Sequence, residues 1–370
     1  MAPLEVAPVR SRAAREGFIG LPYRLHRSDA AWVPPLRRDV RALLSRRNPF
    51  FEHANAEYFL ARRDGAVVGR IAAIHNRLHN EFQRDAVGFF GFFESEDDAR
   101  TAAALFDAAS AWLRARGLQV MRGPASFSTN DECGLLVDGF DTPPTVMMPH
   151  NPRHYVRLVE GAGFAKAKDL LVYQTAVDRP PERLRGGSER LERRHRVTTR
   201  RLDMSRFAAE VDVVKHLYNA AWERNWGFVP MTDREIEHLA RQLKPLVVPE
   251  LVAFAERDGV PIGFGVTLPD VNVALKRNPS GRFFPGILKV LWAARRIKRL
   301  RVLLLGTLPE WRGTGVDALL YRRMWEEAYR MGYRWAEAGW ILEDNHPMRN
   351  GLARMGFEVY KTYRMYDRPL

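Results

Sequence analysis

The residues with the clearest chemical meaning are Arg312-Gly313-Thr314-Gly315, which lie between a predicted strand and a predicted helix. Glycine at positions 313 and 315 lets the backbone turn tightly and approach a ligand closely. The first N–H groups of the helix that begins at Val316 have no partner within that helix, and such an end binds pyrophosphate. An ordinary glycine-rich turn without a ligand also fits the short motif. The residues around the motif are therefore needed to distinguish a phosphate site from a simple turn.

The glycine turn is followed further along the chain by Asn345 and Gly356-Phe357. Together these residues resemble the GNAT acyltransferase superfamily. The resemblance implies that amides of Arg312 to Val316 hold the pyrophosphate of acyl-CoA, the donor substrate, and that the segment from Asn345 holds its pantetheine arm. The family's usual proton-donating tyrosine is replaced here by Leu352. A proton for the departing thiolate must then come from another group, such as Tyr360, or from water.

Acyl transfer to an amine requires a base for the ammonium proton and a hydrogen-bond donor for the developing oxyanion. Glu337, on a predicted strand beside the glycine-turn strand, is the first candidate base, with Glu343 and Asp344 as alternatives. A surface carboxylate or a helix cap is the competing interpretation of each. The backbone N–H of Leu308 is the predicted oxyanion donor, because Pro309 has none.

A set of aromatic and amide residues occupies the place of the first helices of a GNAT fold, which wall the acceptor cleft. We expect these residues and two polar residues at the end of the facing strand to bind the acceptor: Asn219, Trp222, Asn225, Trp226, Phe228, Asp270 and Asn272. Burial in a hydrophobic core is the competing interpretation of each tryptophan.

The same order of elements occurs in both halves of the chain. Hairpin signals at Asp64-Gly65 and Asp258-Gly259 each precede a long amphipathic helix, at 102–116 and 318–330, and strands alternate with helices throughout. The sequence therefore predicts two tandem GNAT-like α/β units with mixed sheets flanked by helices. We expect a degenerate GNAT-like domain without a CoA loop at 1–178, a basic linker at 179–200, and a GNAT domain with the acyl-CoA site at 201–370.

The first half has four carboxylates where the second half has its glycine turn: Glu94, Glu96, Asp97 and Asp98. Carboxylates at a helix N-terminus cap it well but repel pyrophosphate. We therefore expect one donor site in the chain, with the first unit kept for acceptor binding or as a scaffold.

The chain has 370 residues, 46% of them hydrophobic, and a formal net charge of +14. Two segments carry the excess: Arg179–Arg206 has ten arginines and four acidic residues, and Lys276–Arg301 has nine basic residues and no acidic one. The first is typical of a connector between packed units. Because it contains no aromatic residue before Arg201, a nucleic-acid partner that stacks its bases is disfavoured.

The second basic segment contains a predicted amphipathic insert at 282–301, with Phe284, Leu288 and Leu291 at helical spacing and Trp292 beside them. Such a helix is typical of an interfacial segment on an anionic membrane surface. The alternative is a core helix whose arginines face water or the CoA phosphates.

The family resemblance narrows at the segments FGFFES, GPASFSTNDECGLLVDGFDTPP, MMPHNP, NWGFVPMT and WILEDN. They are similar to a branch of tandem GNAT-like bacterial proteins that includes bacterial ceramide synthases. The resemblance implies an N-acyltransferase that transfers a long acyl chain from acyl-CoA to a sphingoid base or a similar lipid amine. It also implies a cytoplasmic protein, peripheral on the cytoplasmic membrane face. An N-acetyltransferase of a small molecule or peptide, and a non-catalytic acyl-CoA or lipid sensor, are the alternatives.

Metal and thiol chemistry are disfavoured by the sequence. His75 with His79 and His150 with His154 have a spacing that suits metal binding, but no third ligand is identifiable. Cys133 is the only cysteine, which excludes an internal disulfide and favours a reducing compartment. No segment is apolar enough to span a membrane.

Overall fold

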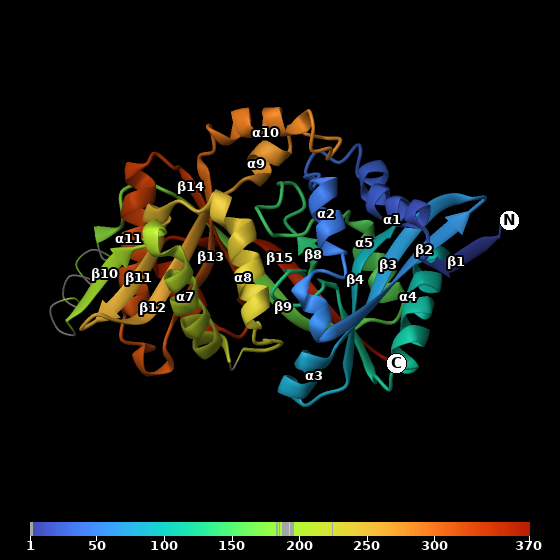
Figure 1. Cartoon of the computed structure of the whole chain (residues 1–370), viewed down its shortest axis with the longest axis horizontal. Coiled ribbons are helices and arrows are strands. Elements are labelled where there is room, and N and C mark those ends of the chain that lie inside the picture. Colours follow the sequence, from blue (N-terminus) through green and yellow to red (C-terminus); the bar gives the residue numbers. More distant parts are fainter. Residues whose placement is uncertain (1–2, 183, 185, 187–191, 193–195, 224) are drawn as a thin grey trace. The chain divides into compact units, whose positions relative to one another are not determined.

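Residues 3–182, 184, 186, 192, 196–223 and 225–370 are described in this computed structural model (Figure 1). The chain forms two compact units. Unit 1 comprises Met1–Leu170, Asn272–Ala294 and Lys361–Leu370, and unit 2 comprises Leu171–Val271 and Arg295–Tyr360. The predicted contiguous domains, 1–178 and 201–370, therefore differ from the units. The reason is that β9 and β15 are long strands whose residues are divided between the two units.

Unit 1 has one sheet in the order β1-β2-β3-β4-β5-β15, with β8 also paired to β15 and a separate pair formed by β6 and β7. Its strands are β1 (Leu4–Pro8), β2 (Ala54–Arg63), β3 (Ala66–Asn76), β4 (Val87–Ser95), β5 (Val120–Gly123), β6 (Ala125–Ser126), β7 (Glu132–Cys133), β8 (Leu135–Asp138) and parts of β9 (Ala165–Ala176) and β15 (Glu358–Pro369). Its helices are α1 (Arg12–Leu25), α2 (Arg37–Leu43), η1 (Pro49–Glu52), α3 (Arg77–Gln83), α4 (Ala99–Arg114), α5 (His154–Gly161), α9 (Asn272–Leu275) and α10 (Gly286–Ala294).

The core of unit 1 forms where the amphipathic helix α4 covers β2, β3 and β4. Leu105, Phe106 and Ala109 of α4 are fully buried against Ile71 and Phe90 of the sheet. The predicted hairpin between β2 and β3 is present, and both turn residues, Asp64 and Gly65, have positive φ. β4 pairs with β5 in parallel.

Unit 2 has its strands in the order β9-β14-β13-β12-β11-β10. Its own strands are β10 (Val197–Arg201), β11 (Val252–Arg257), β12 (Val260–Pro269), β13 (Arg299–Thr307) and β14 (Trp335–Leu342). Its helices are η2 (Met204–Arg206), α7 (Phe207–Trp222), α8 (Asp233–Leu243), η3 (Lys244–Leu246), η4 (Pro249–Leu251), η5 (Pro309–Trp311), α11 (Val316–Arg330) and α12 (His346–Arg354). The pairs from β10 to β13 are antiparallel, and β13 with β14 is parallel.

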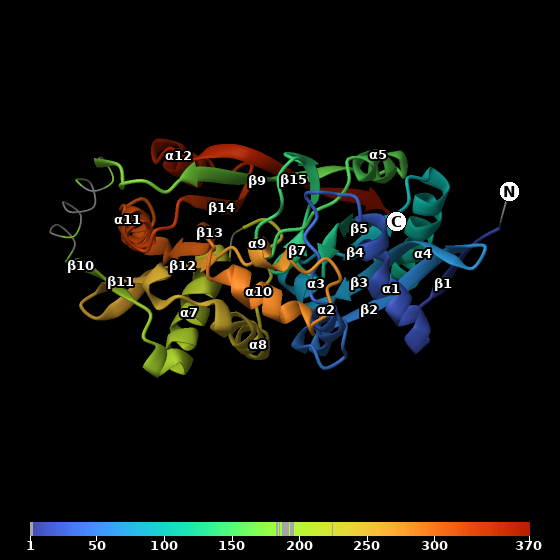
Figure 2. The same ribbon diagram turned by 90° about the horizontal axis from the view of Figure 1, so that it is seen from above.

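The two faces of the unit 2 sheet are covered by different helices. Figure 2 shows α11 and α12 on one face and α7 and α8 on the other. Leu319, Leu320 and Met324 of α11 pack in one hydrophobic core, and Leu217 of α7 packs against Phe254 and Phe264 in another. The predicted mixed sheets flanked by helices are therefore confirmed, and a residue on β13 or β14 faces one of two distinct environments.

Both predicted basic segments differ from expectation. Residues 183, 185, 187–191 and 193–195 of the predicted linker lie outside the described residues, while Val197–Arg201 forms β10 and pairs with β11. The predicted insert 282–301 is a helix only over Gly286–Ala294, which belongs to unit 1. Its last three residues, from Arg299, begin β13 in unit 2, because an alternating pattern suits a strand better than an amphipathic helix.

Candidate active site

The glycine turn of unit 2 connects β13 to α11 by way of η5. Gly313 has φ +70° and Gly315 has φ +93°, a left-handed conformation that residues with a Cβ adopt at a cost. A Cβ on Gly313 would meet no atom within 4 Å, so the backbone conformation, and not crowding, requires glycine there. The turn is thus open on the side where a ligand would approach its backbone.

The N-terminus of α11 has no side-chain cap. Gly315 is the N-cap residue, and the carbonyl of Gly315 accepts from the N–H groups of Ala318 and Leu319. The Thr314 hydroxyl donates backwards to the Trp311 carbonyl at 2.7 Å, so it does not close the helix end. Val316 is fully buried and anchors the first turn in the core, while Arg312 is exposed and donates to the Ala221 carbonyl at 2.9 Å. The leading N–H groups can therefore donate to a phosphate oxygen.

The strands β13 and β14 diverge immediately beside this turn. Their parallel pairing runs from Arg299 with Trp335 to Val302 with Ala338 and ends there. β13 continues to Thr307 and β14 to Leu342, so both strands extend beyond the region in which they pair. Backbone groups along the facing edges of the two strands are consequently available to a ligand that lies between them.

The prediction that Leu308 supplies the oxyanion donor is wrong, because its N–H donates to the Ile262 carbonyl of β12 at 2.9 Å. N–H groups of an antiparallel strand alternate between its two edges. Since Leu308 faces β12, the N–H groups of Thr307 and Leu305 face the edge from which β14 has diverged. The strand was predicted correctly, but the edge to which each N–H group points was not. Only the register of β13 against β12 shows which N–H groups face the gap.

Two predicted catalytic residues, Glu337 and Tyr360, are in direct contact. The Tyr360 hydroxyl donates to Glu337 Oε2, and Glu337 Oε1 lies 3.7 Å from Arg301 Nε. Arg301 also donates to the Gly339 carbonyl at 3.0 Å. Glu337 and Arg301 are 0% and 4% exposed, so the carboxylate lies beside a buried guanidinium, and the half-buried Tyr360 connects it toward solvent.

This contact is part of a longer polar network. The predicted acceptor residue Asp270 is 2% exposed and lies 3.5 Å from Arg299 Nε. The Arg299 guanidinium lies over the Trp335 ring, 3.8 Å from its centre, and Trp335 packs edge-on against Tyr360. Ala336 and Ala338 belong to the core under α11, so Glu337 between them points to the face covered by α7. The sequence offered no sign of Arg299, Arg301 or Trp335 as site residues, because only strand register brings them together.

The segment after β14 has structural roles at several predicted positions. The Asn345 side chain caps α12 by accepting from the Met348 N–H at 3.2 Å. Leu352 is fully buried in the core of unit 2 with Phe357, so a side chain from this position contacts only core residues. Glu343 is half-buried and its carbonyl accepts from Arg349, whereas Asp344 is exposed.

The predicted acceptor residues of α7 are partly core residues. Trp222 packs against Tyr218, with ring centres 4.8 Å apart, and against Phe264 of the sheet, and Phe228 is 5% exposed. The Asn219 amide oxygen, in contrast, is buried and has no hydrogen-bond partner among the described residues. An orphaned polar atom of this kind is a group that a ligand can satisfy.

The remaining acceptor residues occupy different places. The backbone of Asn225 accepts from the Phe228 N–H at 3.1 Å and closes the turn after α7, and Trp226 is half-buried in that turn. Asn272 belongs to unit 1, where its amide donates to the Pro144 carbonyl at 3.0 Å. Asn272 is therefore a structural residue of the other unit.

The equivalent helix end in unit 1 is closed. The Asp98 side chain accepts from the N–H groups of Arg100 and Thr101, and its carboxylate also pairs with Arg63. The other three carboxylates pair with basic side chains, in the pairs Glu94 with His26 and Arg70, Glu96 with Arg24 and Arg63, and Asp97 with Arg157. Because these carboxylates are paired with cations, they repel a phosphate less than we predicted. The main obstacle to phosphate binding is that Asp98 already accepts from the leading N–H groups of α4.

The predicted histidine pairs and Cys133 were compared with a metal site. Among the described residues, no group of three or more His, Cys, Asp or Glu side chains could hold a metal ion. Cys133 is a buried free thiol. His150 pairs with Asp29 at 2.7 Å, and His79 lies 3.4 Å from Asp85. Over the described part of the chain, every helix is too short or too polar to cross a membrane.

Comparison with solved structures identifies the fold. A tandem GNAT protein from the clavulanic acid biosynthesis pathway superposes with a TM-score of 0.59, over 99% of this chain and 98% of that one, at 14% identity. A GCN5-related N-acetyltransferase from Sphaerobacter thermophilus superposes with a TM-score of 0.54, over 100% and 97%, at 14% identity. No family model matches the sequence. The fold is therefore that of the tandem GNAT proteins.

Sequence comparison narrows this class. The chain is 39% identical over 380 residues to a protein named bacterial ceramide synthase from Caulobacter vibrioides, covering 100% of this chain and 98% of that protein. It is 36% identical over 365 residues to Protein YghO from Escherichia coli, covering 96% and 93%. The chain belongs to the family of these bacterial proteins. GNAT enzymes typically use acyl-CoA as the acyl donor. Acyl-CoA is therefore the class of donor that the open N-terminus of α11 has to accommodate.

Proposed function

We propose that this N-acyltransferase transfers a long acyl chain from acyl-CoA to the amino group of a sphingoid base or a similar lipid amine. Binding of the acyl-CoA donor is supported by the uncapped N-terminus of α11 beside the diverging strands β13 and β14. The acceptor half rests on full-length similarity to a protein named bacterial ceramide synthase.

The donor would lie across the open helix end and the gap between the strands. The N–H groups of Gly313, Gly315 and Val316 bind the pyrophosphate, since those of Arg312 and Thr314 already donate to the Pro309 and Trp311 carbonyls. The acyl carbonyl accepts from the N–H of Leu305 or Thr307, whose fixed dipoles stabilise the oxyanion that develops there. The amine nitrogen then bonds to the carbonyl carbon, the carbon–sulfur bond breaks, and CoA leaves as the thiolate.

Proton transfer would use the contact between Tyr360 and Glu337. The ammonium group must lose a proton before its nitrogen can attack, and Tyr360 can accept this proton while passing its own to Glu337. Arg301 holds Glu337 in place and is a positioning residue. The same proton can return through Tyr360 to the departing thiolate, which gives Tyr360 the role that Leu352 cannot fill.

Tyr360→Phe and Glu337→Gln test this route. Each should lower kcat about 100-fold and leave the Kd for CoA within about twofold, because general acid–base groups contribute on the order of 10²–10⁴ to rate. Tyr333→Phe removes a half-buried hydroxyl of unit 2 outside the network and is the matched control. Normal turnover by both site variants would remove these residues from the mechanism.

The substrate assignment is tested with purified protein, palmitoyl-CoA or acetyl-CoA, and a panel of amines that includes sphinganine, spermidine and lysine. Thiol release and mass spectrometry of the amide are the readouts. We expect palmitoyl-CoA with sphinganine to give the highest kcat/KM. Faster turnover with acetyl-CoA and a polar amine would replace the proposal with an N-acetyltransferase, and the absence of release with every pair would indicate a non-catalytic acyl-CoA-binding protein.

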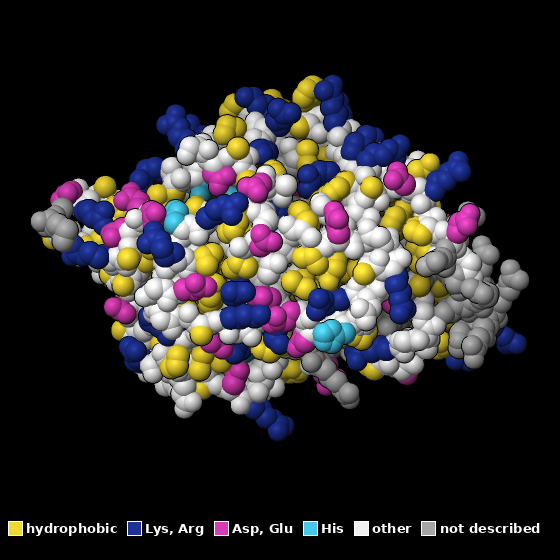
Figure 3. Space-filling model, turned by 180° about the vertical axis from the view of Figure 1, so that it is seen from behind, with side chains coloured by type: hydrophobic (Ala, Val, Ile, Leu, Met, Phe, Trp, Pro, Cys, Tyr) yellow, Lys and Arg dark blue, Asp and Glu magenta, His cyan; other side chains and the backbone are white. Residues whose placement is uncertain are grey.

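A lipid substrate requires access to a membrane, and we propose that α10 provides it. Gly286, Val290 and Ala293 pack inward, whereas the large apolar side chains on the outer face are exposed by 38–71%: Phe283, Phe284, Leu288, Leu291 and Trp292. Lys289, Arg295 and Arg296 are exposed among them. Figure 3 shows hydrophobic and basic side chains together along the edge where Figure 1 has α10. The apolar groups and Lys289 of α10, with Arg295 and Arg296 directly after it, form a segment that fits an anionic bilayer.

Vesicle co-sedimentation tests this surface. Leu288→Glu with Trp292→Glu should abolish binding to phosphatidylglycerol vesicles, and neutral phosphatidylcholine vesicles should bind the wild type weakly. Val260→Glu, which charges another exposed apolar residue, is the matched control. Equal binding by the double variant and the wild type would rule out α10 as the membrane contact.

A further inference from the structure

A cavity of about 810 Å³ lies within unit 1, far along the sequence from the glycine turn. It is formed by the turn between β1 and α1, the end of α2 with η1, and the first half of β2. Its volume falls within the range of sites for drug-sized ligands. Neither the donor turn nor the network around Glu337 contributes a residue to it, so the proposed acyl transfer leaves it without a role.

The charge of the lining is strongly one-sided. Four arginines line the cavity, Arg10, Arg12, Arg15 and Arg46, with Glu57 as the only carboxylate among the described lining residues. Arg10 forms a two-pronged pair with Glu57, at 2.7 and 2.8 Å, and so neutralises it. Arg15 donates one N–H to the Arg41 carbonyl at 3.2 Å. Three guanidinium groups therefore remain without a carboxylate partner in the lining.

Two of these arginines lie at the positive end of a helix. Arg12 and Arg15 occupy the first turn of α1, where the helix dipole is positive and acidic residues are normally preferred; this first turn has none. Ser11 caps only the Ala14 N–H, at 3.0 Å. An anion in the cavity would pair with guanidinium groups of the lining and accept from the leading N–H groups of α1.

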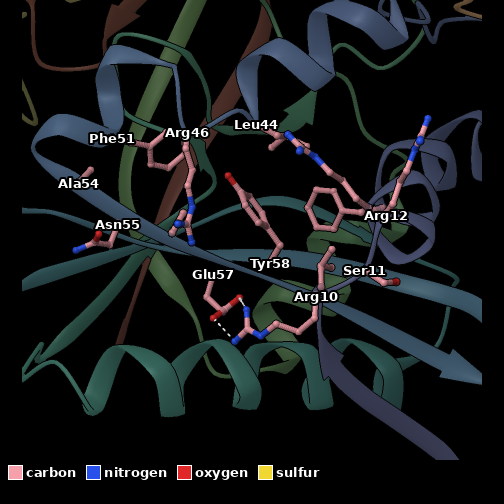
Figure 4. Close-up of a pocket in the computed structure, with 14 residues that line it drawn as sticks. Arg10, Ser11, Arg12, Leu44, Arg46, Phe51, Ala54, Asn55, Glu57 and Tyr58 are labelled. Carbon is pink, nitrogen blue, oxygen red and sulfur yellow. Dashed lines mark hydrogen bonds and ion pairs between the residues drawn. The ribbon is translucent and has the colours of Figure 1, made fainter.

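The floor of the cavity is apolar and aromatic. Phe18 is 1% exposed and packs edge-on against Tyr58, with ring centres 5.3 Å apart, and Leu44 and Phe51 complete the floor. The Tyr58 hydroxyl is buried with no hydrogen-bond partner among the described residues, and burial raises its pKa, so it remains a neutral donor. Figure 4 shows Tyr58 reaching into the space between Arg46 and Leu44.

We propose that this cavity binds an amphiphilic phosphomonoester, with its phosphate on Arg12, Arg15 and Arg46 and its apolar part against Phe18, Phe51 and Tyr58. A guanidinium cluster binds phosphate oxygens in pairs, and the apolar floor adds affinity for a chain or ring attached to the phosphate. The same chemistry can come from a soluble phosphomonoester or from phosphatidic acid in a bilayer.

Calorimetric titration of the full-length protein with decyl phosphate, below its micelle concentration, tests the proposal. We expect one molecule per chain, bound at least tenfold more tightly than inorganic phosphate, and no binding of 1-decanol. Arg12→Ala with Arg46→Ala should raise the Kd at least tenfold, which corresponds to about 1.4 kcal/mol. Arg47→Ala removes a neighbouring exposed arginine outside the lining and should leave the Kd unchanged.

Three results would overturn the proposal: no binding of decyl phosphate, the same loss in Arg47→Ala, or loss of binding in Thr314→Asp, which would place the phosphate on the glycine turn. Where decyl phosphate binds as expected, vesicles containing phosphatidic acid distinguish the source. Weaker vesicle binding by the double arginine variant assigns the site to a lipid headgroup, and unchanged vesicle binding assigns it to a soluble phosphomonoester.

Discussion

The helices α4 and α11 follow equivalent strands in the two units, and their N-termini are built in opposite ways. In unit 1, Asp98 accepts from two leading N–H groups of α4, and Arg63 holds its carboxylate. In unit 2, Gly315 leaves the leading N–H groups of α11 without a side-chain cap. The same helix end therefore serves stability in one unit and is available for a phosphate in the other, since a side chain and a ligand compete for the same donors.

The predicted consequence is that only unit 2 binds acyl-CoA.

The comparison also shows why the net charge near a helix end is a poor guide to whether that end binds phosphate. All four carboxylates near α4 are paired with basic groups, so the local charge is largely cancelled, and occupied N–H groups remain the obstacle. Substitutions that close the open end, or disturb the closed one, can break this comparison.

The largest effect is expected from Thr314→Asp, which places a carboxylate at the open end of α11 and imitates α4. Repulsion and competition for the N–H groups should raise the Kd for CoA about 100-fold, or about 2.7 kcal/mol. Thr314→Asn has nearly the same shape as the aspartate without its charge and should keep most of this loss, because its side chain competes for the same N–H groups. Titration calorimetry with CoA measures both. A wild-type Kd in Thr314→Asp would place the pyrophosphate elsewhere.

A smaller effect is expected from Gly313→Ala, because alanine at φ +70° strains the turn by about 1–2 kcal/mol and shifts its amides. We expect CoA affinity to fall about tenfold. Gly117→Ala in unit 1 is a close control: φ is +75°, and a Cβ there also meets no atom within 4 Å. It should cost similar stability in urea unfolding and leave CoA binding intact. An equal loss of CoA affinity in both variants would mean that strain alone explains it.

The closed end is tested by Asp98→Ala, which should lower the free energy of unfolding by about 1 kcal/mol through loss of the cap. Hydrogen bonds from Thr101 come first among the causes that hold the pKa of Asp98 below its ordinary value of 3.8. A lowered folded-state pKa stabilises the protein above the unfolded pKa, and this contribution disappears as the pH falls through the folded value. The difference between wild type and variant should therefore be constant near pH 7 and vanish in strong acid. A difference that persists there would show that the cap does not depend on charge.

The smallest effect is expected from Glu96→Gln, which weakens a partly exposed pair with Arg24 at 3.0 Å. Stability should change by less than about 0.5 kcal/mol. Unit 1 should still not bind CoA, because Asp98 continues to occupy the helix end. Appearance of a second CoA site in this variant would restore charge repulsion as the controlling factor.

Local patterns predicted much of the fold. The hairpins at Asp64-Gly65 and Asp258-Gly259, the long helices after each sheet segment, and the glycine turn before Val316 all follow from nearest-neighbour chemistry. The unit boundaries did not, because β9 and β15 look like ordinary terminal strands in the sequence. Nothing local marks a strand whose residues divide between two units.

The site was predictable only in part, for a similar reason. Glu337 and Tyr360 were predicted as separate groups, and only the three-dimensional arrangement joins them to each other and to Arg301. Leu308 was chosen over its neighbours because proline lacks an N–H, but strand alternation decides which amide faces the gap. Trp222 was predicted to line the acceptor pocket because aromatic and amide residues surround it in the sequence. In the structure it packs largely as a core residue.

The central claim is that this tandem enzyme has one donor site, at the open end of α11. The most direct test is the stoichiometry of CoA binding to the full-length protein, measured by titration calorimetry beside Thr314→Asp and Glu96→Gln. We expect one CoA per chain in the wild type and in Glu96→Gln, in which Asp98 still caps α4, and none at the same concentrations in Thr314→Asp. Two CoA molecules per wild-type chain, or one retained by Thr314→Asp, would contradict it.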